Sequence, residues 1–294
     1  MLLVSGKVVE NIAIKLLQLA VTELPQDVKN ALQKAYNKEN KVGKSQLEAI
    51  LQNVDLAEKN GSPMCQDTGI IIFYIKAGSK VKGLDKIANA LYSATAKATV
   101  EIPLRPNAVN PFTQKNTGDN IGRNIPYINW EIIPGDTLEI TVLPKGGGSE
   151  NVSALGMLNA SQGTIGLKKF VIDTVIDAGA KPCPPIVLGI AVGGGADIAM
   201  KLAKATLIKP LGQRNNDPDL ANLEKELIEA INSTGIGPMG LGGKTTALDV
   251  KLDFAYRHPA SYPVGIVVQC WAARRASARI YSDANVEYLS HKVI

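Results

Sequence analysis

The stretch Met64–Phe73 constrains this chain more than any other, because reactive and polar side chains stand directly beside an apolar run. Cys65–Thr68 supplies a thiol, an amide, a carboxylate and a hydroxyl, and Gly69 separates them from the apolar residues. β-Branched and aromatic residues favour strands, so the run predicts a buried strand over Ile70–Lys76 with the polar group at its mouth. A polar turn that feeds a strand is the ordinary interpretation of this pattern, and a ligand site at that mouth is the functional one.

The chain has three cysteines, and each stands at the end of a predicted strand. Cys65 precedes the strand just described. Cys183 lies among prolines before the apolar run Ile186–Val192, and Cys270 follows the run Pro263–Gln269. An odd number of widely spaced cysteines without a CxxC pair argues against a disulfide scaffold or a zinc ribbon. Strand ends can converge, so three single thiolates could bind one metal centre, although three buried structural cysteines are the simpler interpretation.

Composition and charge limit the classes of partner. The net charge of +5 comes from 32 basic and 27 acidic residues that are spread along the chain, and only 5% of the residues are aromatic. Nucleic-acid-binding proteins usually carry a dense basic stripe or stacking aromatics. Val8–Val21 is amphipathic rather than a signal-peptide core, and the longest apolar run, Pro184–Gly195, is shorter than a membrane span. We therefore expect a cytoplasmic protein that binds neither nucleic acid nor membranes.

The order of predicted elements indicates a mixed α/β fold, with a helical N-terminal third followed by strands interleaved with helices around one central site. A chain of 294 residues can form one large domain or two intimate ones, and we treat residues 1–294 as one. The N-terminal helices, within residues 1–60 or so, are expected at Val8–Leu24, Gln26–Lys38 and Lys44–Lys59. Further helices are expected at Leu84–Val100, Val152–Leu158, Leu167–Gly179, Ile198–Ala205 and Asp219–Asn232, and in the basic tail from Trp271.

Turn signals predict two pairs of neighbouring strands. Pro134–Asp136 separates the alternating stretches Ile128–Ile133 and Thr137–Leu143, which is typical of a hairpin. The stretches Val250–Tyr256 and Pro263–Gln269 are expected to pair in the same way.

Two loops carry groups suited to anions. Arg105 stands between Pro103 and Pro106, which stiffen the backbone, and a rigidly held arginine suits bidentate recognition of a carboxylate. An ordinary solvated loop arginine is the alternative. In Gly146–Gly148 three glycines let backbone N–H groups point into a cavity, before an expected helix start at Ser149. This loop matches neither GxGxxG nor a Walker A sequence, so a nucleotide site is a poor match.

Taken together, the motifs resemble those of the iron–sulfur hydro-lyases, the class I fumarases and L-tartrate dehydratases. The resemblance runs in order over nearly the whole chain. Its motifs are Cys65–Gln66–Asp67–Thr68–Gly69, Gly146–Gly147–Gly148–Ser149–Glu150–Asn151, Cys183–Pro184–Pro185, Thr234–Gly235–Ile236–Gly237–Pro238 through Gly243, and Cys270. The chain looks like the α subunit, or N-terminal catalytic region, of an enzyme whose other part is a separate β subunit.

The resemblance implies a cofactor and a reaction. Cys65, Cys183 and Cys270 would hold a 4Fe–4S cluster and leave its fourth iron open as a Lewis acid. The reaction implied is the reversible dehydration of (S)-malate to fumarate, a step of the tricarboxylic acid cycle.

The resemblance also implies roles for other residues. Gln66, Arg105 and the backbone at Gly148 would contact the substrate. Asp67 and His258 would form an acid dyad for the departing hydroxyl; His258 is one of two histidines and stands twelve residues before Cys270. The base for the carbon-bound proton, with further carboxylate-binding residues, would come from the β subunit. We therefore expect a hetero-oligomer, in which this chain alone turns over little or no substrate.

Three alternatives remain open on sequence alone. Within the class, the substrate could be L(+)-tartrate or a mesaconate-type dicarboxylate. Outside it, the chain could be a non-enzymatic iron–sulfur or redox-sensing subunit, against which the open iron and the Asp67/His258 pair argue. A nucleotide-binding protein is the third, suggested only by the glycine loops.

Overall fold

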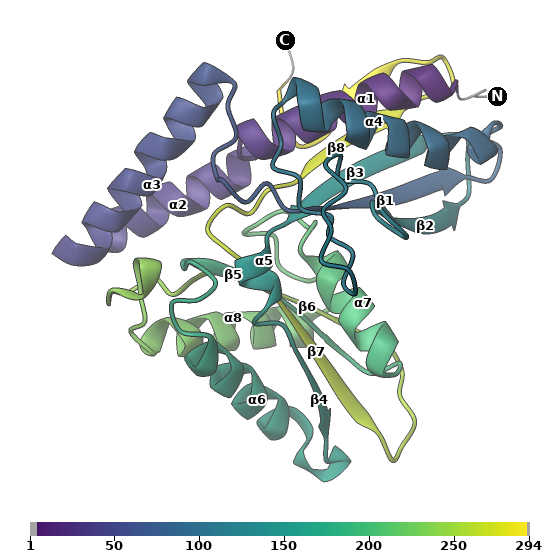
Figure 1. The fold of residues 1–294 in the computed structure, drawn as a ribbon. Coiled ribbons are helices and arrows are strands. Elements are labelled where there is room, and N and C mark those ends of the chain that lie inside the picture. Colours follow the sequence, from purple (N-terminus) through teal and green to yellow (C-terminus); the bar gives the residue numbers. More distant parts are fainter. Residues whose placement is uncertain (1–4, 293–294) are drawn as a thin grey trace. The chain divides into compact units, whose positions relative to one another are not determined.

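The computed structural model describes residues 5–292 and has the mixed α/β fold that the sequence predicts (Figure 1). The chain forms two compact units, each assembled from segments distant in sequence. Unit 1 comprises Met1–Gln26, Asn53–Gly146 and Arg274–Ile294, and unit 2 comprises Asp27–Gln52 and Gly147–Ala273. Within residues 5–292, no helix is both long enough and apolar enough to cross a membrane.

Three helices form where the apolar spacing predicts them, which confirms the helical N-terminal region. They are α1 (Gly6–Thr22), α2 (Gln26–Lys38) and α3 (Lys41–Asn60). In α1, Val9, Ile12 and Leu16 recur at helical spacing and are buried in the core of unit 1. Apart from its first residue, α2 belongs to unit 2, so the helical region is divided between the two units rather than forming a body of its own.

The sheet of unit 1 has the strand order β2-β1-β3-β8-β9. Its strands are β1 (Ile70–Gly78), β2 (Tyr127–Ile133), β3 (Leu138–Lys145), β8 (Ala276–Ile280) and β9 (Val286–Tyr288). Helices α1 and α4 (Ile87–Glu101, preceded by a 3-10 turn at Leu84–Lys86) lie together along the sheet (Figure 1). Alternate residues of β1, Ile71, Phe73 and Ile75, are buried in the core that these helices share with the sheet.

The sheet of unit 2 has the strand order β4-β7-β5-β6. Its strands are β4 (Ala154–Leu158), β5 (Ile186–Val192), β6 (Ala247–Phe254) and β7 (Tyr262–Gln269). The helices are α6 (Gly163–Ala178), α7 (Ala196–Thr206) and α8 (Pro218–Ser233), and short turns form at α5 (Gly147–Glu150), Ala160–Gln162 and Pro238–Gly240. Helix α7 packs on Gly189 and Gly265, while Leu188 and Ile190 point to the core shared with α6 and α8. The central strand β5 is therefore covered on both faces.

Both predicted hairpins are wrong, for the same reason. The strands β2 and β3 each pair with β1, which lies between them, and β6 and β7 each pair with β5. In each case an apolar strand, β1 or β5, lies between the two, because an interior position in the sheet suits a strand that is rich in apolar residues. Strands that follow each other in sequence are thus separated by one strand in the sheet.

Two predicted helices are strands. Val152–Leu158 contains β4, whose residues alternate in exposure, and the tail beyond Trp271 contains β8 and β9. Both segments are short, and their partners, β7 and β3, decide their conformation.

Candidate functional site

The Cys65 turn lies at the mouth of β1 and is held by hydrogen bonds on both sides. Asn53 Nδ2 donates to the carbonyl oxygen of Met64 at 2.8 Å, which fixes the residue before the cysteine. Buried Thr68 donates through Oγ1 to the carbonyl oxygen of Arg105 at 3.2 Å. The turn and the Arg105 loop are therefore joined, although 37 residues separate them in the chain.

Gly69 lets the turn pass close to the end of β3. Its φ is +87°, and a Cβ at this position would lie 2.7 Å from the backbone nitrogen of Lys145. Only glycine combines that backbone conformation with so close an approach.

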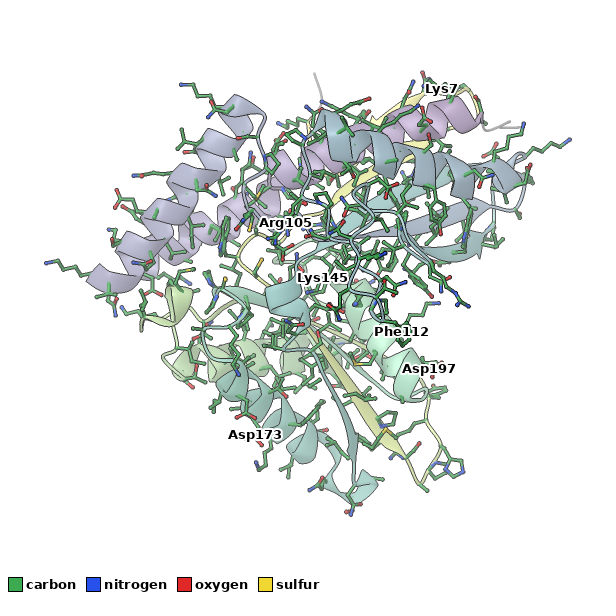
Figure 2. All side chains as sticks on the ribbon, viewed as in Figure 1. Lys7, Arg105, Phe112, Lys145, Asp173 and Asp197 are labelled. Carbon is green, nitrogen blue, oxygen red and sulfur yellow. The ribbon has the colours of Figure 1, made fainter. Side chains whose placement is uncertain are left out.

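A pocket of about 430 Å³ opens beside the turn and is lined by Pro63, Cys65, Gln66, Thr68, Pro103 and Arg105. Three of the predicted site residues, Cys65, Gln66 and Arg105, are thus brought together in one pocket. Arg105 and Lys145 mark this end of the unit 1 sheet in Figure 2. A thiol, an amide and a guanidinium in one open pocket suit an anionic ligand that reaches a thiolate-bound metal.

Asp67 is fixed on the same turn. Its Oδ1 accepts a hydrogen bond from the backbone N–H of Gly69 at 2.9 Å and lies 3.4 Å from Asn107 Nδ2. Its Oδ2 borders Gly146, because a Cβ built on that glycine would lie 3.0 Å away. One carboxylate oxygen is thereby committed to the turn, and the other faces the glycine-rich loop.

Cys183 and Cys270 come together at one end of unit 2. Strand β5 begins after Cys183 and runs antiparallel to β7, which ends before Cys270. The backbone N–H of Trp271 donates to the carbonyl oxygen of Cys183 at 3.2 Å, and Cys183 adopts a left-handed φ of +54°. Gly148 lies at this end as well, since a Cβ there would lie 3.3 Å from the carbonyl oxygen of Lys181.

His258 lies at the opposite end of unit 2. It is exposed in the loop between β6 and β7, and its Nδ1 accepts a hydrogen bond from the backbone N–H of Ala260 at 3.1 Å. Strand β7 has 8 residues, and it separates His258 from Cys270. At about 3.3 Å per residue that separation is roughly 26 Å.

All three cysteines are thiols of intermediate exposure, and the described residues hold none of them in a disulfide. Among residues 5–292, no three His, Cys, Asp or Glu side chains gather into a metal-binding group, and Cys65 belongs to unit 1 while the other two belong to unit 2. The donor chemistry nevertheless fits an iron–sulfur cluster, whose usual ligands are cysteine thiolates.

Comparison with known proteins identifies the family. Residues 10–279 match the sequence model of the family described as fumarate hydratase (Fumerase). The chain belongs to the fumarate hydratase family.

Relatives of this fumarate hydratase-family chain agree with that placement. It is 50% identical over 283 residues to "Putative L(+)-tartrate dehydratase subunit alpha" of Methanocaldococcus jannaschii, which covers 95% of this chain and 99% of the relative. It is 36% identical over 272 residues to L(+)-tartrate dehydratase subunit alpha of Escherichia coli K12, covering 92% of this chain and 90% of the relative. The chain is therefore an α subunit of the hydro-lyase class, which excludes the non-enzymatic and nucleotide-binding alternatives as its primary role.

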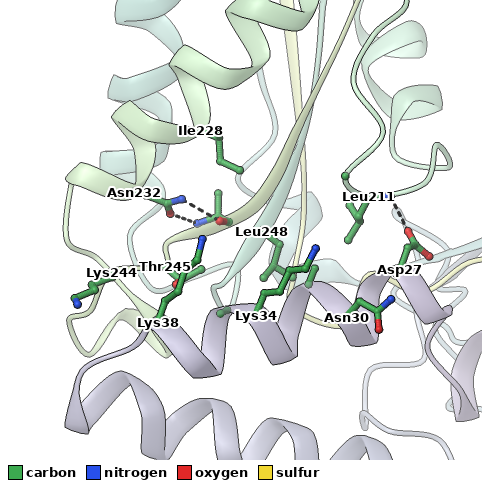
Figure 3. A pocket seen from close by; sticks show the side chains of 14 residues that line it. Asp27, Asn30, Lys34, Lys38, Leu211, Ile228, Asn232, Lys244, Thr245 and Leu248 are labelled. Carbon is green, nitrogen blue, oxygen red and sulfur yellow. Dashed lines mark hydrogen bonds between the residues drawn. The ribbon is translucent and has the colours of Figure 1, made fainter.

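A larger cavity in unit 2, of about 480 Å³, contains none of the predicted site residues. Lys34 and Lys38 extend from α2 toward it (Figure 3), and its floor is aliphatic. Asp27, the one carboxylate in its lining, accepts a hydrogen bond from the backbone N–H of Leu211 at 2.6 Å. The cavity offers neither a thiol nor a histidine for hydro-lyase chemistry, so we assign the candidate site of this family member to the Cys65 pocket.

Sequence reasoning missed two buried cations beside the Asp67 turn. Lys145 is 3% exposed and pairs with Ile70 across the β1–β3 ladder, and Arg274 is 1% exposed. Arg274 Nη1 donates to the carbonyl oxygen of Asp67 at 2.7 Å. The basic run at residues 274–275 was a visible signal, but a helix was expected there and the run was given no role in the site.

Proposed function

We propose that this chain is the α subunit of an iron–sulfur hydro-lyase that reversibly removes water from a 2-hydroxy dicarboxylate, with (S)-malate and fumarate as the first pair to test. The observation that carries the proposal is the pocket in which Cys65 lies with Gln66 and Arg105. With malate as substrate the reaction is a step of the tricarboxylic acid cycle. Three cysteines held as thiols, outside any disulfide among the described residues, suit the reducing cytoplasm, where we place the protein.

Cys65, Cys183 and Cys270 would hold a 4Fe–4S cluster, which supplies a Lewis acid at its open iron when bound. Cys183 and Cys270 already share one end of unit 2, which supports their role as a pair. Cys65 would complete the set from the turn before β1.

Arg105 and Gln66 would bind and orient the substrate carboxylates. Both side chains are exposed in the pocket, and the arginine backbone is held by Thr68 and by Asn120, whose Nδ2 donates to the Arg105 carbonyl oxygen at 3.2 Å. A guanidinium on a fixed backbone can form two parallel hydrogen bonds to a carboxylate. The backbone N–H of Gly148 would add a third anchoring donor.

Asp67 would hold the proton that leaves with the hydroxyl, because its turn bonds leave Oδ2 facing away from Gly69. The proposed partner, His258, is roughly one strand length from Cys270 of its own copy, about 26 Å at 3.3 Å per residue. That distance is too long for contact with a substrate bound beside Cys270. We therefore infer that His258 reaches the site only from a second copy of the chain.

The base for the carbon-bound proton, with further carboxylate-binding residues, would come from a β subunit. This is supported by the names of two relatives, which are called subunit alpha and which this chain covers almost completely. The functional assembly would then be a hetero-oligomer.

L(+)-Tartrate is the second candidate substrate, because the curated relatives carry that name. Tartrate differs from malate by one hydroxyl, so a donor or acceptor for that group must distinguish them. Mesaconate-type substrates add a methyl group instead and remain a third possibility within the same chemistry.

The test is anaerobic assay of the chain, purified with and without its β subunit, on malate, L(+)-tartrate and mesaconate. We expect turnover of one dicarboxylate by the complex and little or none by the isolated chain. A complex that carries a cluster but dehydrates none of the three substrates would refute the proposed function, and full activity of the isolated chain would refute the need for a partner.

The role of His258 can be tested by mixing two inactive chains, Cys270→Ser and His258→Ala, during assembly with the β subunit. If each site takes His258 from the other copy, roughly a quarter of wild-type activity returns, because half of randomly assorted pairs are mixed and each mixed pair holds one intact site. No recovery, with both variants folded, would exclude a shared site.

A further inference from the structure

Arg274 is buried beside the Cys65 turn with an incomplete set of hydrogen bonds. The residue is 1% exposed, and its one hydrogen bond within residues 5–292 runs from Nη1 to the carbonyl oxygen of Asp67 at 2.7 Å. Its Nε is buried and has no hydrogen-bond partner among the residues that the structure describes. A buried guanidinium carries five N–H donors, and leaving them unpaired is costly. Such a group persists in a fold only where something else requires it.

The guanidinium and the Asp67 carboxylate border the same glycine. A Cβ built on Gly146 would lie 3.0 Å from Asp67 Oδ2 and 3.4 Å from Arg274 Nη2. Because position 146 is a glycine, no side chain fills the space between the Asp67 carboxylate and the Arg274 guanidinium. A Cβ at this position would be in tight contact with the Asp67 carboxylate, which would have to shift slightly to admit it.

A second buried cation stands close by. Lys145 is 3% exposed, lies opposite Ile70 at the start of β1, and directs Nζ to the carbonyl oxygen of Gly146 at 3.5 Å. In a medium of low dielectric constant, buried cations interact strongly with nearby anions, and thiolates and dicarboxylates are anions of that kind.

We propose that Arg274 is a positioning residue of the hydro-lyase site, which fixes the Asp67 backbone and thereby aims the Cys65 thiol and the Asp67 carboxylate. The reason for this positioning rests on the proposed function, but the experiments on the chain without cofactor test the positioning by themselves. Arg274 stands four residues after Cys270, so the segment that follows one proposed cluster ligand carries the group that holds the turn of another, Cys65.

The first experiment uses the full chain without cofactor. In a Cys183→Ser/Cys270→Ser background Cys65 is the single thiol, so its alkylation rate reports the turn alone. The Gly69 amide, which donates to Asp67 Oδ1, reports the same turn by hydrogen exchange. In Arg274→Met we expect that amide to exchange about 10- to 100-fold faster, as loss of a hydrogen bond to a charged group predicts, together with a changed Cys65 alkylation rate.

Two further variants separate positioning from general destabilisation. Arg274→Lys keeps the charge and one donor, so its exchange and alkylation rates should lie between those of wild type and Arg274→Met. Arg279→Met is the control, since Arg279 stands on β8 but binds Glu139 through Nε at 3.0 Å and Nη2 at 2.7 Å. It should leave both rates at the turn unchanged.

If Arg274→Met folds and leaves Gly69 exchange and Cys65 alkylation at wild-type values, Arg274 does not position the turn. If Arg274→Met fails to fold, Arg274→Lys provides the test. Wild-type rates of Gly69 exchange and Cys65 alkylation in Arg274→Lys, together with unaltered turnover, would overturn the proposal.

The holoenzyme gives an independent readout. With the β subunit and cluster present, Arg274→Met should lower kcat about 100-fold, as a misplaced reacting group does, while KM changes little. A wild-type complex without activity would refute the proposed function, yet the exchange and alkylation results would still stand or fall by themselves.

Discussion

Two arginines, one in each unit, show how a fully paired (closed) and an incompletely paired (open) charge arrangement differ in the same chain. The side chain of Arg214 is 24% exposed, whereas Arg274 is 1% exposed. In unit 2, Arg214 binds Asp249 and lies 3.4 Å from Glu224, and Lys251 lies 3.0 Å from Asp249. Two carboxylates and two cations therefore balance each other, and every side chain except that of Arg214 is at most 2% exposed. In unit 1, Arg274 donates one hydrogen bond, to the carbonyl oxygen of Asp67, and its Nε has no partner within residues 5–292.

The two arrangements differ in what they do for the protein. The network around Asp249 ties the loop before α8 to β6, because Asp249 Oδ2 accepts from the backbone N–H of Gly212 at 2.7 Å and Glu224 Oε1 accepts from that of Leu252 at 2.9 Å. Burial lowers the pKa of Lys251, and the nearby Asp249 carboxylate opposes that shift. Every strong group in this network has a partner within it. Arg274, in contrast, has its one hydrogen bond with the turn that carries the proposed chemistry. We therefore interpret its burial as serving the site rather than the stability of the fold.

The largest effect that this comparison predicts is on turnover at the open site. Asp67→Asn keeps an oxygen for the Gly69 N–H but cannot transfer a proton, so we expect activity to fall about 10²- to 10⁴-fold. The free energy of unfolding should change by about 1 kcal/mol or less, since the turn bonds persist. Anaerobic kinetics and urea unfolding of the same preparation measure both quantities. Turnover within a factor of two of wild type would remove Asp67 from the mechanism.

The reverse pattern is expected at the closed site. Asp249→Asn leaves Arg214 and Lys251 without their shared anion and should cost about 3–5 kcal/mol of unfolding free energy. Turnover per folded molecule should stay at the wild-type value. The control is Asp253→Asn, whose pair with Lys209 is 38% and 46% exposed and should be worth less than about 1 kcal/mol. Equal losses in the two variants would contradict the distinction between buried and exposed pairs.

A smaller effect is expected at an ion-pair cluster in unit 1. Its charges are paired with one another, as in the network around Asp249, but the cluster lies near the surface. Glu10 accepts hydrogen bonds from Lys7 at 2.7 Å, Lys97 at 2.6 Å and Ser93 at 2.5 Å. The bonds from Lys7, Lys97 and Ser93 lower the pKa of Glu10 from 4.5 to about 2. The unfolded chain binds this proton more readily, so the stability that Glu10 contributes is complete above pH 4.5 and is lost as the pH falls to about 2.

Glu10→Gln should therefore flatten the dependence of unfolding free energy on pH between about 4.5 and 2. Near pH 7 the slope of that dependence should be the same as in wild type. Glu131→Gln serves as the matched control, because Glu131 lies 3.8 Å from Lys76 with 61% of its side chain exposed. If the unfolding free energy depends on pH in the same way in both variants below about pH 4.5, the three donors do not lower the pKa of Glu10.

Local patterns in the sequence predicted the strand ends well and the strand order poorly. Ile186–Val192 is predicted to the residue, and each cysteine lies at a strand end as expected, because apolar runs and prolines are local signals. The hairpins failed because β1 and β5 insert between strands that follow each other in sequence. That choice depends on long-range burial, which no window of the sequence contains.

The site was predictable to a similar degree. Cys65, Gln66 and Arg105 share a pocket as the motifs imply, and Cys183 and Cys270 share a strand-end edge. Arg274 was not assigned to the site because the basic tail beyond Trp271 was expected to form a helix, and no local signal links it to the Cys65 turn. Only the β3–β8 pairing places that tail inside unit 1. The dyad of Asp67 with His258 stays a prediction, now with the requirement for a second copy.

The measurement that tests the central claim most directly is anaerobic reconstitution with iron and sulfide, on wild type and on the Cys65→Ser, Cys183→Ser and Cys270→Ser variants. The account predicts that wild type assembles a cluster whose absorption spectrum changes on addition of malate or L(+)-tartrate, and that each serine variant loses the cluster or that response. A chain that forms no cluster, or one that is indifferent to all three cysteines, would return those thiols to a structural role and contradict the proposed mechanism.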